Sequence, residues 1–238
     1  MMPDLRYNEE NSEWSEDSMN GRYFTEFLMG RDAVPVLFEP FLSKTHAETL
    51  IWRRGEHLWA SEEAVIDTLL SLTDRTRADV IVLDPAAMPY TDALPDLIRK
   101  KRAETDVGFC LLCRTERDLA IAEACADCVG LYGDLITGKL PVIRMDGGIE
   151  DAISRGDCGY FAQSGCEDLL EKYGDRIRIL GGLGVEEIIA AQPVEIYNKV
   201  EEIFRKHPGR WACGSGGVLG GDNYLELISL LGAFGRVR

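Results

Sequence analysis

The alternation of short apolar runs with amphipathic stretches, from residue 21 to the end of the chain, is the feature that most constrains the fold. Strands that alternate with helices pair in parallel through right-handed crossovers. We predict eight strands, over Val34–Glu39, Val80–Asp84, Val107–Cys113, Cys128–Tyr132, Pro141–Asp146, Tyr160–Gln163, Arg176–Leu180 and Arg210–Cys213. Helices are expected over Glu62–Arg75, Asp92–Glu104, Glu116–Ala126, Ile149–Arg155, Glu167–Tyr173, Val185–Lys206 and Asn223–Phe234. Eight such units favour an α/β fold of the (β/α)8 barrel type, with an open doubly wound sheet as the competitor.

The length and the charge narrow the class of protein further. A chain of 238 residues suits one large domain, and we expect a barrel over 21–238 preceded by an acidic tail or cap over 1–20. The net charge of −15 disfavours nucleic acid and anionic membrane surfaces as partners. No apolar run is long enough for a membrane span, the first 20 residues lack the pattern of a secretory signal, and the seven cysteines indicate reduced thiols. A cytoplasmic location is therefore expected.

Polar residues at the ends of the predicted strands mark the candidate site, because barrels build their sites at the carboxyl ends of the strands. Glu39, Asp84 and Asp146 end the first, second and fifth predicted strands, and Arg144 lies two residues before Asp146. Residues two apart on a strand share a face, so Arg144 is expected to point into the barrel if Asp146 does. A buried arginine needs an anionic partner, which is either a neighbouring acid or the carboxylate of a substrate.

Two glycine-rich turns follow the seventh and eighth predicted strands. Barrels often bind anions there through loop N–H groups, although glycine is equally expected from turn geometry alone. The residues that we assign to substrate binding in these turns are Gly182, Gly184, Gly214, Ser215 and Gly216.

The remaining motifs are weaker. Two CxxC pairs, Cys110–Cys113 and Cys125–Cys128, have zinc-like spacing, but positions three apart on a strand point to opposite faces, so ordinary buried cysteine is the better interpretation. The stretch Pro40–Trp59 is long for a connection and is interpreted either as a lid or as an extra helix. His46 and His57, which lie in it, keep a chance of acid–base work, whereas surface histidine is the default for these and for His207.

Several segments together resemble the uroporphyrinogen decarboxylase superfamily, whose fold is a (β/α)8 barrel. The clearest are KYGDRIRILGGLGVEEIIAAQPVEIYNKVEEIF, Lys172–Phe204, and GRWACGSGGVLGGDNYLELISLL, Gly209–Leu231, in which Asn223 takes the place of the family's asparagine at the start of the final helix. Looser similarity extends over VPVLFEPF, Val34–Phe41, ADVIVLDP, Ala78–Pro85, and PVIRMDGGIEDAI, Pro141–Ile153.

The resemblance implies two chemistries. The decarboxylases act on a carboxylated tetrapyrrole without metal or cofactor, through an arginine-rich segment after the first strand and an aspartate after the second. Asp84 stands in the place of that aspartate, while FEPFLSK replaces the arginine-rich segment and GSGGVLGG lacks the late histidine of the decarboxylases. The methyltransferases of the family hold zinc by a His-x-Cys pair, whose places here are taken by Arg144 and Asp146, and by a later cysteine, near whose place Cys213 lies.

We therefore predict a divergent decarboxylase-like enzyme that acts on a carboxylated tetrapyrrole, a corrinoid-related molecule or another small carboxylated molecule, with no metal and no cofactor. Asp84 is the predicted catalytic residue, and Arg144, Asp146 and Glu39 are predicted to hold or orient the ligand. A corrinoid-linked methyltransferase and a non-catalytic binding barrel are the alternatives. An anionic small molecule is the expected partner, and a homodimer and a corrinoid protein are candidate assemblies.

Overall fold

The computed structural model describes residues 22–31, 36–38, 57–76 and 78–220, together with Leu227 and Phe234. Glu39, His46, Asn223, the acidic segment 1–20 and all but the end of Pro40–Trp59 lie outside the described residues.

The described residues form one parallel sheet of eight strands, in the order β1-β8-β7-β6-β5-β4-β3-β2. The strands are β1 (Val36–Leu37), β2 (Val80–Leu83), β3 (Gly108–Cys113), β4 (Cys128–Leu131), β5 (Val142–Arg144), β6 (Gly159–Ala162), β7 (Arg178–Leu183) and β8 (Trp211–Ser215). Each strand from β3 to β8 lies beside its predecessor in sequence, and β1 lies beside β8. This is the strand order of a (β/α)8 barrel, whereas a doubly wound sheet reverses direction at its middle. The α/β prediction and the choice of a barrel over the open sheet are confirmed.

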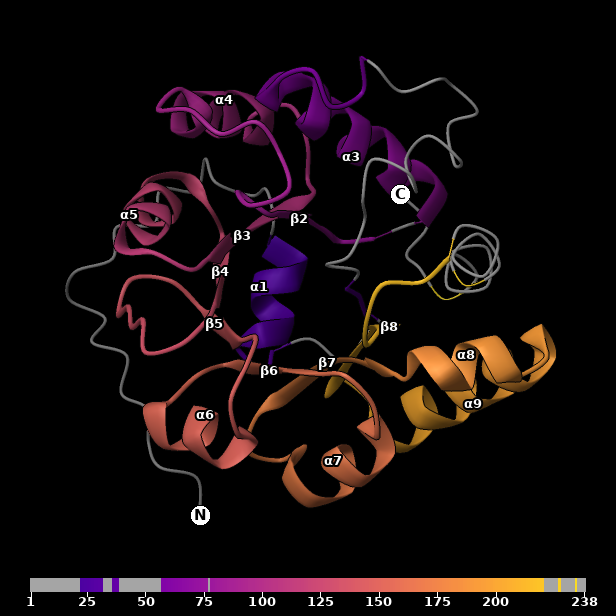
Figure 1. Ribbon diagram of the computed structural model, residues 1–238. Helices are drawn as coiled ribbons and strands as arrows, with labels where there is room; N and C mark the ends of the chain where they lie inside the picture. The colour runs from indigo at the N-terminus through magenta and orange to yellow at the C-terminus, as the bar shows by residue number, and fades with distance from the viewer. Residues whose placement is uncertain are drawn as a thin grey trace.

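Helices surround the curled sheet (Figure 1). They are α3 (Glu62–Thr76), α4 (Leu94–Arg102), α5 (Glu116–Cys125), α6 (Ile149–Arg155), α7 (Cys166–Tyr173), α8 (Val185–Ala190) and α9 (Pro193–Lys206). The prediction of a single long helix over Val185–Lys206 was wrong, because the chain is extended at Ala191 and Gln192 and a new helix begins at Pro193. Proline disfavours helical backbone in the residue before it but suits the first position of a helix.

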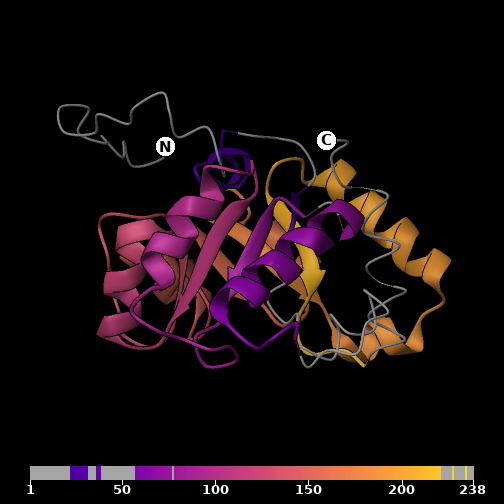
Figure 2. The same cartoon turned by 90° about the horizontal axis from the view of Figure 1, so that it is seen from above.

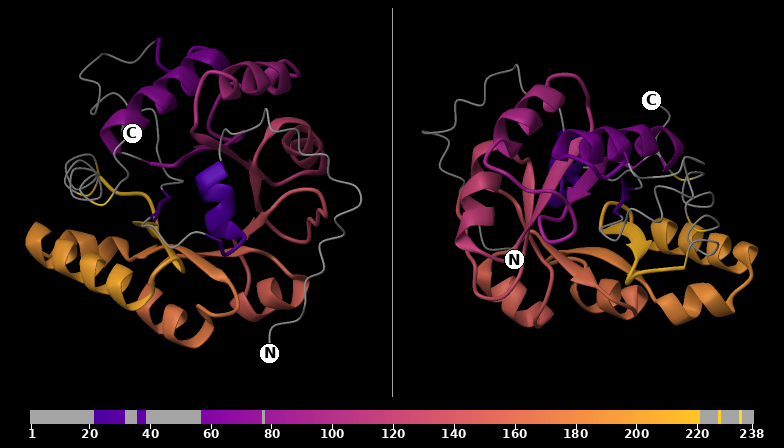
Figure 3. Two further views of the ribbon diagram at one scale, coloured as in Figure 1. Left: turned by 180° about the vertical axis from the view of Figure 1, so that it is seen from behind. Right: turned by 45° about the horizontal axis from the view of Figure 1, so that its top comes forward.

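A helix that we did not predict, α1 (Arg22–Leu28), lies at the centre of the ring. Viewed from the side, it lies at the end of the barrel from which the strands start (Figure 2), and it stays central when the molecule is seen from behind (Figure 3). Phe24, Phe27 and Leu28 join the core of the barrel interior, where Leu112, Ile143 and Leu180 point inward from β3, β5 and β7. Helix α1 therefore closes the amino-terminal end of the barrel.

Two further apolar clusters fill the layer between the sheet and the outer helices. One packs β2, β3 and β4 against α3, α4 and α5, and the other packs β6, β7 and β8 against α6, α7, α8 and α9. Alternate residues of each strand thus point to two different cores, which fixes the face of every residue in the ladder. Within the described ranges, no helix is both long and apolar enough to cross a membrane.

Candidate active site at the carboxyl ends of the strands

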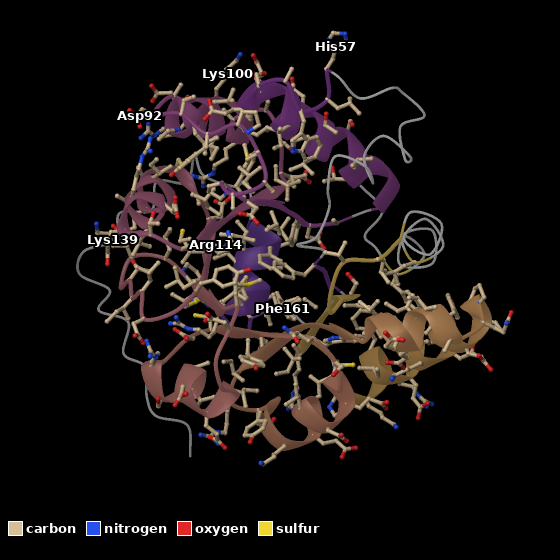
Figure 4. All side chains as sticks on the ribbon, in the orientation of Figure 1. His57, Asp92, Lys100, Arg114, Lys139 and Phe161 are labelled. Carbon is tan, nitrogen blue, oxygen red and sulfur yellow. The ribbon has the colours of Figure 1, made fainter. Side chains whose placement is uncertain are left out.

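Three polar side chains continue the inward-facing positions of neighbouring strands at the carboxyl-terminal end of the barrel. The alternation Val80, Val82 in β2 leads to Asp84, and Cys110, Leu112 in β3 leads to Arg114. In the same way β4 leads to Tyr132, which packs on the inner core. Arg114 lies on the inner side of the ring in Figure 4, whereas Asp92, Lys100 and Lys139 lie at its periphery. The parallel register therefore brings the carboxylate of Asp84, the guanidinium of Arg114 and the phenol of Tyr132 to one side of the barrel mouth.

Asp84 and Arg114 form a bidentate ion pair across the ends of β2 and β3. Nη1 of Arg114 donates to Oδ1 of Asp84 at 2.6 Å, and Nη2 donates to Oδ2 at 3.2 Å. The two side chains are 25% and 39% exposed, respectively, so the pair is partly desolvated yet open to a ligand. A bidentate pair of this kind fixes the orientation of both planar groups.

The guanidinium of Arg114 also stacks on Tyr132, with its central carbon 4.3 Å from the ring centroid. Burial raises the pKa of the Tyr132 phenol, the positive charge of Arg114 opposes this, and the charges of Asp84 and Asp146 raise it further. The hydroxyl of Tyr132 therefore stays protonated at neutral pH and is available as a hydrogen-bond donor.

Asp146 follows the end of β5, and its charge is one of those that raise the pKa of Tyr132. Both of its carboxylate oxygens accept from the backbone N–H of Gly133, each at 3.0 Å, and the side chain is exposed. Its charge also raises the pKa of the Tyr160 phenol, for which burial is the larger cause. Asp146 thus ties the end of β5 to the end of β4 and places a second negative charge at the mouth.

The loop that follows β2 is held in place by its own bonds. Oδ1 of Asp84 accepts from the backbone N–H of Ala86 at 2.9 Å, and the indole of Trp59 donates to the carbonyl of Ala87 at 3.0 Å. The carboxylate of Glu62, at the start of α3, accepts from both the backbone N–H and the hydroxyl of Thr91. These contacts pre-organise the carboxylate of Asp84 on a fixed turn.

Arg144 lies elsewhere, which corrects our expectation that it shares the interior with Asp146. Arg144 is the last residue of β5 and points to the outer layer, where it is 3% exposed. Its Nε donates to Oδ2 of Asp157 at 2.8 Å, and its Nη1 donates to the carbonyl of Gly133 at 2.8 Å. Since the β4–β5 connection contains no helix, Arg144 holds this loop on the barrel, and its anionic partner is a neighbouring acid.

The predicted glycine turns lie at the ends of β7 and β8. Gly182 has a φ of 84°, and a Cβ on it would lie 2.6 Å from the Cβ of Cys166. A Cβ on Gly216 would lie 1.7 Å from the carbonyl oxygen of Gln163. Backbone packing therefore requires these two glycines, whatever else they do. Gly184 precedes α8, and Gly214 and Ser215 are buried in β8.

No group of three or more potential metal ligands occurs among the described residues. Cys213 is buried and packs in the outer layer, on the face of β8 that points away from the interior. His57 is exposed and His207 follows the end of α9. None of these side chains adds to the group formed by Asp84, Arg114, Tyr132 and Asp146, which we call the mouth cluster.

Sequence reasoning named Asp84 and Asp146 and missed Arg114 and Tyr132. The signal was available, because each of the two missed residues follows an apolar strand at an inward position. The spacing of Arg144 from Asp146 suggested a shared face and favoured Arg144 as the arginine of the site.

Comparison with known proteins supports the fold. No family model matches the chain, and no curated protein matches it. Among solved structures, a methyltransferase from Methanosarcina mazei is similar with a TM-score of 0.57 and 13% sequence identity, over 89% of this chain and 98% of that one. Monomers of phosphoribosylanthranilate isomerase from Thermotoga maritima match over 70% of this chain and 93% of that one, with 17% identity and a TM-score of 0.45. At the identity of the first match the similarity establishes a barrel-like fold alone.

Proposed function

We propose that this chain is a divergent barrel enzyme of the uroporphyrinogen decarboxylase type, which acts on a small carboxylated molecule bound at the mouth cluster. The observation that carries the proposal is the bidentate pair of Asp84 and Arg114, stacked on Tyr132 at the carboxyl ends of β2, β3 and β4. In a barrel this is the end at which catalytic residues gather.

Arg114 is the group proposed to bind the ligand carboxylate. A guanidinium has five N–H donors, and within the described part of the chain Asp84 takes two of them. Burial lowers the pKa of Arg114, but the hydrogen bond and the charge of Asp84 outweigh that effect and raise it, so the guanidinium stays charged when a ligand excludes water. Arg114 takes over the role that the sequence assigned to Arg144.

Asp84 is the proposed catalytic residue. Arg114 and the N–H of Ala86 fix the orientation of its carboxylate, so the carboxylate need not rearrange when a ligand binds. In this position the carboxylate of Asp84 stabilises positive charge that develops on the ligand, or relays a proton to the ligand. Tyr132 and Asp146 complete the wall, the first as a donor of a hydrogen bond and the second as a further acceptor. A tetrapyrrole or a corrinoid-related molecule, which carries several carboxylates, is the substrate class that we propose to test first.

Methyl transfer is the second candidate activity. It is favoured by the similarity of the fold to the methyltransferase from Methanosarcina mazei and by the family resemblance. The outward position of Cys213 leaves that thiol unable to share a site with Asp146 in the present arrangement. The third candidate function is a barrel that binds its ligand without turnover.

The decisive experiment separates binding from turnover in matched variants. Uroporphyrinogen, kept reduced under anaerobic conditions, and a panel of smaller carboxylates are titrated against the protein by calorimetry, and products are followed by mass. We expect Arg114→Met to weaken binding of the carboxylated ligand about 10- to 100-fold, since charge-assisted hydrogen bonds are lost. Asp84→Asn should lower turnover about 100-fold or more while binding changes less.

Arg117→Met is the matched control. Arg117 lies three residues beyond Arg114 and pairs with Asp92 at the surface, where the side chains are 59% and 91% exposed. This variant should bind and turn over as the parent does. If no carboxylated ligand binds, or if Arg114→Met and Arg117→Met bind equally, the proposal fails. Binding without turnover would favour the non-catalytic barrel, and methyl transfer from methylcobalamin to a thiol would favour the second candidate.

A further inference from the structure

The two CxxC pairs that the site does not use are split by the fold into an inner and an outer set. Cys110 and Cys128 point into the barrel and belong to its interior core, whereas Cys113, at the end of β3, and Cys125, at the end of α5, belong to the outer layer. The outer thiols donate to local carbonyls: Sγ of Cys113 to Leu111 at 3.5 Å and Sγ of Cys125 to Ile121 at 3.1 Å. For the two inner thiols, by contrast, the nearby Cys110 is one of the causes that raise the pKa of Cys128, after burial.

The register places the inner pair directly opposite one another. Cys110 and Cys128 are Cα partners in the parallel ladder of β3 and β4. Neighbouring strands lie about 4.8 Å apart, and disulfides span Cα separations of about 4.4–6.8 Å. A bond between the two sulfurs therefore requires rotation of the side chains and no separation of the strands.

Helix α1 covers this pair. Cys110 and Cys128 are fully buried, and Phe24, Phe27 and Leu28 of α1 pack in the same cluster. These apolar side chains hold α1 on the barrel, and Nε of Arg178 donates to the carbonyl of Phe27 at 3.1 Å. Burial raises the pKa of the Cys128 thiol well above its usual range, so the thiol reacts slowly while the helix is in place.

We propose that Cys110 and Cys128 are a redox-modifiable dithiol that forms a disulfide by exchange with a low-molecular-weight disulfide when α1 leaves the end of the barrel. In the first step one thiolate attacks the small disulfide, forms a mixed disulfide and releases one small thiol. In the second step the other cysteine attacks the mixed disulfide, and the second small thiol leaves. The protein loses two protons and two electrons, and the small disulfide is reduced to two thiols. This proposal is independent of the proposed function.

The experiment uses the full chain with oxidised glutathione at pH 8.5, followed by alkylation, trypsin and mass spectrometry. In the parent, the tryptic peptides 103–114 and 118–139 carry two cysteines each. The double variant Cys113→Ala/Cys125→Ala leaves one cysteine in each peptide, so a cross-link between these peptides then identifies Cys110–Cys128. Fragmentation of the cross-linked peptides from the parent gives the same assignment if the double variant does not fold.

Access through α1 is tested by a matched pair of variants of the same helix. Phe27→Ala removes a fully buried anchor, whereas Tyr23→Ala changes a side chain that is 46% exposed. We expect oxidation to be about ten times faster, or more, in Phe27→Ala and unchanged in Tyr23→Ala, because reactions of buried groups follow local opening. Cys166 is the first residue of α7 and is buried in the outer layer, so its alkylation reports global unfolding, and its rate should stay the same in both variants.

Three results would overturn the proposal. The first is that all seven thiols survive prolonged exposure to the small disulfide. The second is a cross-link between other cysteines, above all Cys128 with the neighbouring Cys158. The third is an equal rate of oxidation in Phe27→Ala and Tyr23→Ala, which would show that α1 does not control access.

Discussion

Replacement of Arg144 by methionine tests whether this residue belongs to the scaffold or to the site. Methionine keeps much of the length and volume of the side chain and removes its charge and donors. In the structure, Arg144 and Asp157 have side chains that are each 4% exposed, and Arg144 also donates to the carbonyls of Gly133 and Leu135. The substitution therefore leaves a buried carboxylate without its counter-ion and a loop without its anchor.

The expected loss of stability follows from these contacts. Removal of one partner of a buried ion pair costs about 3–5 kcal/mol, and loss of the bonds to the two carbonyls adds about 1 kcal/mol. A total of about 4–6 kcal/mol is a large part of the 5–15 kcal/mol that is usual for a domain. At about 2–4 °C for each kcal/mol, the melting temperature should fall by roughly 10–20 °C.

Urea unfolding followed by circular dichroism measures this effect, and two variants control it. Arg144→Met/Asp157→Asn should recover about half of the loss, because the unpaired charge is gone. Arg155→Met breaks a pair with Asp134 in which the side chains are 33% and 97% exposed, so it should cost less than about 1 kcal/mol. A loss below 1 kcal/mol in Arg144→Met, together with weaker binding of a carboxylated ligand, would refute the scaffold role and restore Arg144 to the site.

Two other predictions concern packing and pH. Gly216→Ala should prevent folding or lower stability by several kcal/mol, because its Cβ would overlap the carbonyl of Gln163. The control Gly138→Ala, whose Cβ would meet no atom within 4 Å, should unfold at the same urea concentration as the parent. Equal urea midpoints for the two variants would refute the close approach at Gly216. Burial raises the pKa of Asp127 to about 6, against the opposing charge of Arg102, so the carboxyl destabilises the fold as pH rises from 4 through 6. Relative to Asp127→Asn, the free energy of unfolding of the parent should fall by about 3 kcal/mol over that range, and parallel pH profiles would contradict the raised pKa.

The order of the strands and most of the outer helices could be predicted because their signals are local. The helix predicted over Ile149–Arg155 has those bounds in the structure, and Gly156 ends it with a φ of 78°. Helix α1 escaped prediction because it is short, with neither an acid in its first turn nor a base in its last. Its stability comes from tertiary packing, and the only local sign is the helical spacing of Phe24, Phe27 and Leu28.

The two arginines show where alternation along a strand can be trusted. Residues two apart share a face within a strand and at the residue that directly follows it. Strand β5 ends at Arg144, and Asp146, two residues beyond that end, binds the N–H of Gly133 and shares no face with Arg144. Arg114 directly follows β3, and the buried residues Cys110 and Leu112 within that strand show that its position faces inward. A residue directly after a strand is thus better assigned from the buried residues before it than from a polar residue beyond it. By that rule the sequence points to Asp84, Arg114 and Tyr132 together, and their meeting at the barrel mouth follows from the parallel register of β2, β3 and β4.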